Sequence, residues 1–100
     1  MRPPRMRSPL KSEIYEIFLE EFLQLRANAG LSQTDLADKL GIGQDVVSRC
    51  ESGRRRIDVL ELQQWAFACG SSLLDFSKKL DERVQRNRNP DGSTKGWKSH

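Results

Sequence analysis

Residues 33–52 read QTDLADKLGIGQDVVSRCES, and the pattern of this stretch is the most informative about the fold. Two segments of about two helical turns each flank Gly41, a residue type that readily adopts the positive φ of a tight turn. Ala37 is small at the point where two crossing helices would approach closely. Apolar residues stand where such a pair would bury itself, at Leu36, Leu40, Ile42, Val47 and Cys50. The spacing predicts two short helices, the second from Gln44 to Glu51.

Two short helices that cross at a tight turn form a helix-turn-helix. This motif projects its second helix into a DNA major groove about 12 Å wide. The alternative is a plain helical hairpin inside a bundle. A plain hairpin requires neither Ala37 nor Gly41 at this spacing, so we favour the helix-turn-helix.

Before this stretch, the sequence predicts one long helix. Ser8 and Pro9 suit the cap and the first residue of a helix, and Gly30 suits its end. Between them, apolar residues recur at steps of three and four, as one face of a helix requires. These residues are Ile14, Phe18, Phe22, Leu25 and Ala29.

Capping boxes mark the start of three further helices. In a capping box a side chain and a backbone N–H bond reciprocally at a helix start. The pairs are Ser32 with Asp35, Asp58 with Glu61, and Ser72 with Asp75. They predict a helix from 33 to 40, a fourth helix through Cys69 and a fifth to about residue 85. The fourth helix is expected to bury Val59, Leu62, Ala66 and Cys69. No alternation typical of strands occurs, so the fold class is all-α with five helices.

The charge distribution limits where an anionic partner can bind. A chain of 100 residues with a formal charge of +3 has room for one small domain. We expect three parts: a basic flexible arm over 1–8, the helical domain over 9–86 and a polar basic tail over 87–100. Residues 12–82 hold eight basic and thirteen acidic residues, a net charge of −5. Attraction to an anion should therefore be confined to one local face, helped by the basic ends.

The composition also excludes several classes of protein. No segment approaches the roughly 18 to 20 apolar residues of a membrane-spanning helix. The N-terminus lacks the apolar segment of a signal peptide, so a cytoplasmic protein is expected. The only histidine is His100, and the two cysteines, Cys50 and Cys69, form neither a disulfide framework nor a metal site. We therefore expect no metal, no cofactor and no enzymatic activity.

Residues 25–56, LRANAGLSQTDLADKLGIGQDVVSRCESGRRR, resemble phage repressors of the Cro/cI type, which include regulators of the xenobiotic-response-element class. The resemblance extends over about residues 10–80. Its most specific pieces are Gly30 to Gln33, Leu36-Ala37, Leu40-Gly41, Val47 to Arg49 and Glu51 to Gly53. It implies a five-helix lambda-repressor-like domain with the helix-turn-helix at helices two and three. Members regulate transcription by binding double-stranded DNA, usually as homodimers on palindromic operators.

The resemblance implies roles for the polar residues of this stretch. Gln44 would read adenine, Arg49 would reach guanine or a phosphate, and Ser48 would contact a phosphate or a base. The phosphate contacts would come from Gln33, Arg54, Arg55 and Arg56. Arg26 and Glu51 match positions that pair with each other in the family, and we favour this pair over a base contact by Glu51.

Three residues depart from the family pattern. Gly43 stands where a Ser or Thr usually caps the second helix of the motif. The absence of this cap should lower the stability of the fold by a few tenths to about 1 kcal/mol. Asp45 is acidic at a position that faces bases, so it either accepts from cytosine N4 or repels phosphate and sharpens specificity. Cys50 replaces a larger apolar residue, which favours core packing over a redox switch.

Apolar residues outside the predicted core indicate association. Leu60 and Phe67 occupy positions that the family often leaves polar, and Leu74 continues their seven-residue spacing. Each of these residues alone can simply widen the core. Together they exceed what a small core covers, so we predict that they contribute to a homodimer interface.

The leading prediction is a dimeric, sequence-specific transcription regulator. A repressor is favoured because no separate ligand or activation domain fits in 100 residues. The alternative is an antitoxin or another interaction protein that binds its own promoter while Leu60 and Phe67 face a protein partner such as a toxin. A third class, an enzyme or a structural bundle without a DNA role, lacks support. The sequence has no internal histidine and no glycine-rich phosphate loop.

Overall fold

The computed structural model describes residues 9–88, with side chains from residue 13 onward. The arm expected over 1–8 and residues 89–100 of the expected tail lie outside the described residues. Five α-helices follow one another: α1 Pro9–Ala29, α2 Gln33–Leu40, α3 Gln44–Glu51, α4 Val59–Ala68 and α5 Leu73–Arg88. No strand occurs within 9–88, so the all-α class is confirmed.

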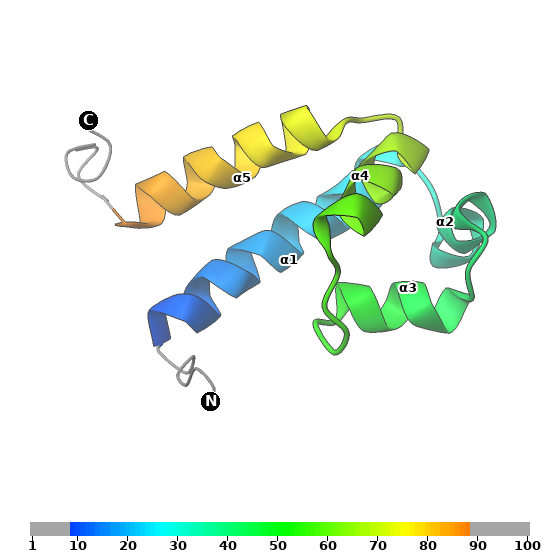
Figure 1. Cartoon of the computed structure of the whole chain (residues 1–100), viewed down its shortest axis with the longest axis horizontal. Helices are drawn as coiled ribbons and strands as arrows, with labels where there is room; N and C mark the ends of the chain where they lie inside the picture. Colours follow the sequence, from blue (N-terminus) through cyan, green and yellow to red (C-terminus); the bar gives the residue numbers. More distant parts are fainter. Residues whose placement is uncertain (1–8, 89–100) are drawn as a thin grey trace.

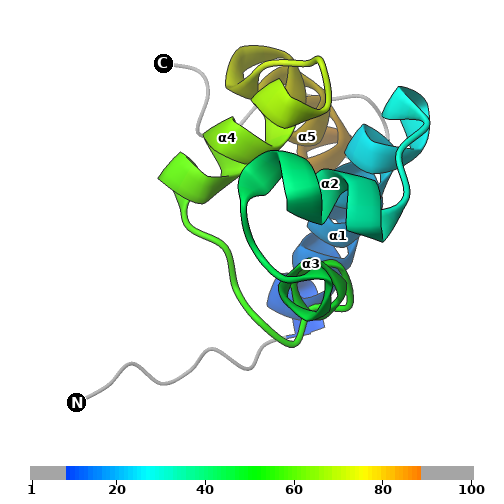
Figure 2. The same ribbon diagram turned by 90° about the vertical axis from the view of Figure 1, so that its right-hand side faces the viewer.

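Two long helices and three short ones are arranged so that α3 lies at an edge of the fold. α1 and α5 pack along each other, and α2, α3 and α4 gather near one end of this pair (Figure 1). α2 contacts both α3 and α4, while α3 also touches α1. Figure 2 shows α3 end-on with α2 lying across it. The inner face of α3 therefore packs on α1 and α2, and its other face is turned away from the core.

An aromatic cluster joins α1, α4 and α5. The ring of Phe22 lies 4.8 Å from that of Trp65, and both side chains are buried. Phe18 stacks on Phe22 at 5.4 Å and meets Phe76 edge-on at 5.8 Å. Such aromatic pairs add about 0.5–1.5 kcal/mol each beyond the burial of their area. Their contacts link α4 and α5 to α1, against which the helix-turn-helix also packs.

Local signals at the helix ends explain why α2 and α4 begin where they do. Both predicted capping boxes are present, Ser32 with Asp35 at α2 and Asp58 with Glu61 at α4. At α5 half of the third box forms: the Ser72 hydroxyl accepts from the Asp75 N–H at 3.0 Å. Gly41 ends α2 with a φ of 71°, the left-handed conformation expected of the turn.

Burial differs from expectation on α4 and in the turn. Val59, expected to face inward, is 61% exposed, because it lies in the first turn of α4 beyond the edge of the core. Trp65, which the sequence interpretation missed, takes the central place in the core instead. Ile42 is 37% exposed in the turn, and Cys69 is only half-buried, since it caps α4 near the surface.

Two helix ends also differ from expectation. α4 ends at Ala68 and Cys69 is its cap. α5 continues to Arg88, so residues 87 and 88, expected to begin the tail, are helical. None of the helices in residues 9–88 is both long and apolar enough to cross a membrane. Within the same range, no cluster of three or more histidine, cysteine or acidic side chains is placed to hold a metal ion.

Candidate nucleic-acid interface

A buried ion pair anchors the end of α3. Arg26 on α1 donates from Nε to Glu51 Oε2 at 2.8 Å and from Nη2 to Glu51 Oε1 at 2.9 Å. The Glu51 side chain is 4% exposed and that of Arg26 is 19% exposed. The hydrogen bond to Glu51 raises the pKa of Arg26. A buried carboxylate needs such a partner because an unpaired charge away from water is costly.

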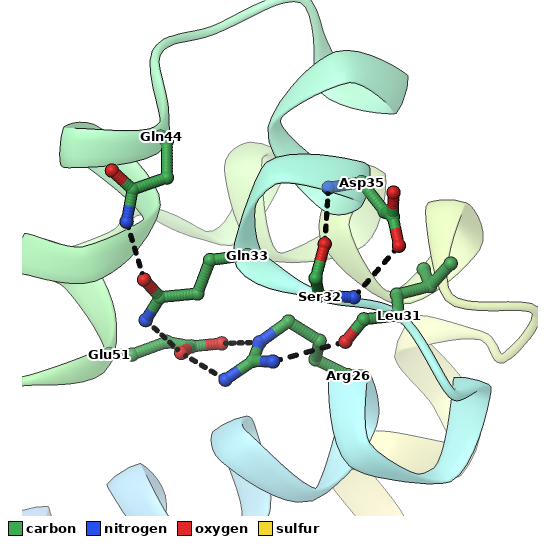
Figure 3. A network of polar contacts seen from close by, with 7 residues as sticks. All are labelled: Arg26, Leu31, Ser32, Gln33, Asp35, Gln44 and Glu51. Carbon is green, nitrogen blue, oxygen red and sulfur yellow. Dashed lines mark hydrogen bonds and ion pairs between the residues drawn. The ribbon is translucent and has the colours of Figure 1, made fainter.

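The same ion pair also reaches the start of α2. Arg26 Nη1 donates to the carbonyl oxygen of Leu31 at 3.0 Å, in the loop before the Ser32 cap (Figure 3). One guanidinium therefore joins α1, the end of α3 and the loop that leads into α2. These contacts set the position of both helices of the helix-turn-helix relative to α1.

Two glutamines extend this network to the surface. Gln33 Nε2 donates to Glu51 Oε1 at 3.0 Å, and Gln44 Nε2 donates to Gln33 Oε1 at 2.6 Å (Figure 3). Because Glu51 only accepts, the chain of donors fixes which way each amide points. The Gln44 amide, which is exposed, retains an acceptor and a second N–H. An acceptor and a donor side by side are the two groups that pair with adenine N6 and N7.

The outward face of α3 carries the other residues expected to read bases. Asp45 and Arg49 are exposed and form an ion pair, with Arg49 Nη1 3.2 Å from Asp45 Oδ2. Ser48 is half-buried. The opposite face of α3 is buried through Val47, Cys50 and Glu51. The structure thus brings Gln33 of α2 to Gln44 at the start of α3, and Asp45 to Arg49 on the exposed face of α3.

The three arginines after α3 differ in their surroundings. Arg54 is exposed. Arg55 donates to Glu61 Oε2 at 3.1 Å and to the sulfur of Cys50 at 3.3 Å. Hydrogen bonding to Glu61 raises the pKa of Arg55 and lowers that of Glu61. Arg55 is therefore tied to α4, whereas sequence reasoning had treated it as a simple phosphate contact.

Arg56 packs on α1. Its guanidinium lies 4.4 Å from the ring centroid of Tyr15, within the range of a cation–π contact. Sequence reasoning missed both Tyr15 and Glu61 as partners of these arginines. The two partners lie on α1 and α4, and only the folded chain brings them close to these arginines. The sequence around Glu61 indicated its role in the cap of α4 but not its contact with Arg55.

The loop between α3 and α4 also presses against α1 at Gly53. Gly53 has a φ of +82°, and a Cβ there would lie 3.0 Å from Leu19 Cδ1 and 3.5 Å from Tyr15 Cε2. A larger residue would therefore be strained in its backbone and would push against α1. The loop that carries Arg54 to Arg56 is held at a defined distance from α1.

The apolar side chains expected to mediate association are exposed. Leu60 and Phe67 on α4 are 72% and 74% exposed, and Leu74 in the first turn of α5 is 76% exposed. None of the three widens the core, the alternative considered for each. They lie on α4 and α5 rather than on α3.

The sequence of the chain matches the model of a known protein family whose fold agrees with this arrangement of helices. The family model HTH_3, described as Helix-turn-helix, matches residues 23–76, just over half of the chain. The match runs from the second half of α1 through α2, α3 and α4 into the start of α5. The chain belongs to this helix-turn-helix family. No curated protein matches the chain.

The matched family is the Cro/C1-type helix-turn-helix family, and it indicates what the geometry of the site is for. The fold is lambda-repressor-like, and this helix-turn-helix protein is a DNA-binding transcription regulator in general terms. The family is regulatory and not typically enzymatic. Its second helix-turn-helix element corresponds to α3, the helix that carries Gln44 and Arg49.

Proposed function

We propose that this protein is a homodimeric repressor that reads a palindromic operator through the DNA major groove, with α3 as the reading helix. The observation that carries the proposal is the connected network from the buried Arg26–Glu51 pair to Gln44 on the exposed face of α3. Side chains that are already bonded to the folded domain need little reordering on binding, which favours specific recognition.

Base reading and phosphate binding fall to different residues in this proposal. Gln44 pairs with adenine, Arg49 donates to guanine, and the half-buried Ser48 contacts a phosphate or a base near the helix. Phosphate contacts come from Gln33 at the start of α2 and from the arginines of the loop after α3. These loop residues are Arg54, Arg56 and, through the N–H groups that its bond to Glu61 leaves over, Arg55. Phosphate contacts set the register of the protein on DNA and base contacts select the sequence.

The exposed apolar side chains support a homodimer. Leu60, Phe67 and Leu74 each expose about three quarters of their surface on α4 and α5. A two-fold dimer through these helices would place two copies of α3 about 34 Å apart, one turn of DNA, and would match a palindromic site. Phe67→Glu would place a charge in that interface.

Repression follows most simply from this arrangement. A dimer bound across a promoter excludes the polymerase by occupancy alone and needs no activating surface. The DNA partner implies that the protein acts in the cytoplasm of a bacterium or of a phage-infected cell. The net charge of −5 over residues 12–82 means that DNA attraction depends on the α3 face and the loop after it.

A second function, as an antitoxin, is favoured by the same exposed residues. In that case Leu60 and Phe67 would be covered by a toxin, while α3 binds the promoter of the toxin–antitoxin genes. The mass of the native complex distinguishes the two proposals. Two copies of this chain support the homodimeric repressor, and a second polypeptide in fixed proportion supports the antitoxin.

A titration of the DNA upstream of the protein's own coding region tests the proposed function. The fraction bound is measured by mobility shift at two salt concentrations, with and without random competitor DNA. Specific binding should survive the competitor. It should also weaken steeply with salt, with a slope of about −0.9 per phosphate contact. Binding that the competitor abolishes would refute sequence-specific recognition of this DNA.

A further inference from the structure

Asp45 and Arg49 form one polar group on the exposed face of α3. Their head groups lie 3.2 Å apart, and their side chains are 70% and 48% exposed. They stand four residues apart on the helix, so they lie one above the other on the same face. A carboxylate and a guanidinium thus point outward together from the helix that faces the DNA in the proposed function.

The missing cap at the start of α3 leaves space for this carboxylate. Gly43 is the N-cap residue of α3 and makes no side-chain hydrogen bond. A Cβ at Gly43 would lie 2.6 Å from Asp45 Oδ1, closer than real Cβ contacts allow. The positive end of the helix dipole also favours an acidic side chain in the first turn. Arg49 and the positive end of the helix dipole therefore both attract the Asp45 carboxylate.

We propose that Asp45 and Arg49 act together to read a single G·C base pair. This inference rests on the proposed function and names the sequence feature that the reading helix selects. In the major groove, guanine presents the acceptors N7 and O6, and cytosine next to them presents the N4 donor. Arg49 supplies two donors, and the neighbouring Asp45 supplies the acceptor. The two donors of Arg49 and the acceptor of Asp45 thus follow the same order as the two acceptors of guanine and the donor of cytosine along the edge of the base pair.

The same pair rejects an A·T base pair. There the edge presents an acceptor, a donor and an acceptor. One N–H of Arg49 would face the adenine amine, and the Asp45 carboxylate would face the thymine O4. Both contacts are repulsive, so discrimination comes from mismatch as well as from attraction. Arg49 alone would recognise guanine without testing the cytosine N4, and Asp45 supplies this second test.

Base analogues test the proposal directly on the unaltered protein. Selection from random duplexes identifies a preferred site, and affinities are then measured by fluorescence anisotropy for that site carrying single modified bases. N4-methylcytosine uses its one remaining N4 hydrogen in base pairing and so removes the donor to Asp45. Affinity should fall about fivefold or more when the modified cytosine is the partner of the guanine read by Arg49, the lower end of the range for a good base contact.

Variants separate base reading from a general charge effect. Asp45→Ala should lose sensitivity to N4-methylcytosine and should bind more random duplexes with similar affinity. Asp38→Ala is the control, because it removes the same charge from an exposed position on α2. It should keep the full sensitivity. Circular dichroism confirms that both variants are folded.

The outcomes distinguish this proposal from the proposed function. If the unaltered protein selects no sequence, the proposed function itself fails. If it selects a site but N4-methylcytosine has no effect at any position, Asp45 does not read cytosine and the proposal is overturned. An Asp45→Ala variant that retains the sensitivity of the unaltered protein overturns it equally.

Discussion

Removing the Arg26 cation that pairs with Glu51 at the end of α3 should destabilise the whole domain. The substitution Arg26→Leu deletes both hydrogen bonds that Glu51 receives from the guanidinium, at 2.8 and 2.9 Å. The Glu51 side chain is only 4% exposed, so its carboxylate relies on protein partners rather than on water. Gln33 remains as one neutral donor to the carboxylate. A buried charge that loses its partner is among the more costly changes a small domain can undergo.

The size of the loss follows from the burial of the two side chains. Breaking a fully buried ion pair costs about 3–5 kcal/mol. Arg26 is 19% exposed, which places the expected loss for Arg26→Leu near the lower end, about 3 kcal/mol. A domain of this size has a free energy of unfolding of about 4–12 kcal/mol. The variant should therefore keep about 1–9 kcal/mol and unfold at a lower urea concentration than the unaltered protein.

Urea unfolding followed by far-UV circular dichroism measures this loss, and a double-mutant cycle isolates the pair. Glu51→Leu alone should also be destabilising, because it leaves the Arg26 guanidinium without its carboxylate. The double variant Arg26→Leu/Glu51→Leu should lose less than the two single losses added together, because it leaves no unpaired charge. Single losses below about 0.5 kcal/mol, or strict additivity, would refute the reasoning.

Three further predictions concern the turn, a cap and the proposed interface. Gly41→Ala should lower the free energy of unfolding by about 1–2 kcal/mol, because the φ of 71° is left-handed; an unchanged thermal midpoint would contradict this. Arg55 holds the pKa of Glu61 below its ordinary value of 4.5, so the stabilising contribution is complete above about pH 4.5 and is lost as the pH falls through the lowered pKa. Glu61→Gln should therefore have a lower free energy of unfolding than the unaltered protein at pH 7, and the two should become equal in acid. A difference between their urea midpoints that stays constant across that pH range would argue against the contact. Phe67→Glu should sediment as a monomer where the unaltered protein sediments as a dimer, and a persistent dimer would place the interface elsewhere.

The local parts of the fold could be predicted because their signals span only a few residues. The Ser32 box and Gly41 set both ends of α2, and the predicted bounds of α3 agree with the structure. These features depend on the conformation of one glycine and on hydrogen bonds between side chain and backbone within one helix turn. No information about the rest of the molecule is needed to place them.

The packing of α4 could not be predicted in the same way. Val59 and Trp65 are both apolar on a short helix, and the helical period alone does not say where the core ends. The partner ring of Phe22 on α1 selects Trp65, and Val59 extends past the edge. Periodicity gives a face, whereas the neighbouring helices decide which part of that face is covered.

The connections within the candidate interface also depend on tertiary geometry. The resemblance suggested the Arg26–Glu51 pair, but the contact of Gln33 with Gln44 requires the actual crossing of α2 over α3. The contact of Arg55 with Glu61 requires the path of the loop after α3. These contacts change what is expected of the residues. Arg55, an expected phosphate ligand, is already tied to α4, and Gln44, an expected base-reading residue, is bonded through Gln33 to the buried Glu51.

In the proposed function, the exposed face of α3 reads DNA sequence while the loop after it binds phosphate. Fluorescence anisotropy at one salt concentration separates these two roles when Arg49→Ala and Arg54→Ala are compared on a selected duplex and on a scrambled duplex. Arg49→Ala should cost about 1–3 kcal/mol on the selected duplex and much less on the scrambled one, whereas Arg54→Ala should weaken both alike. Equal losses on the two duplexes for Arg49→Ala would contradict the account.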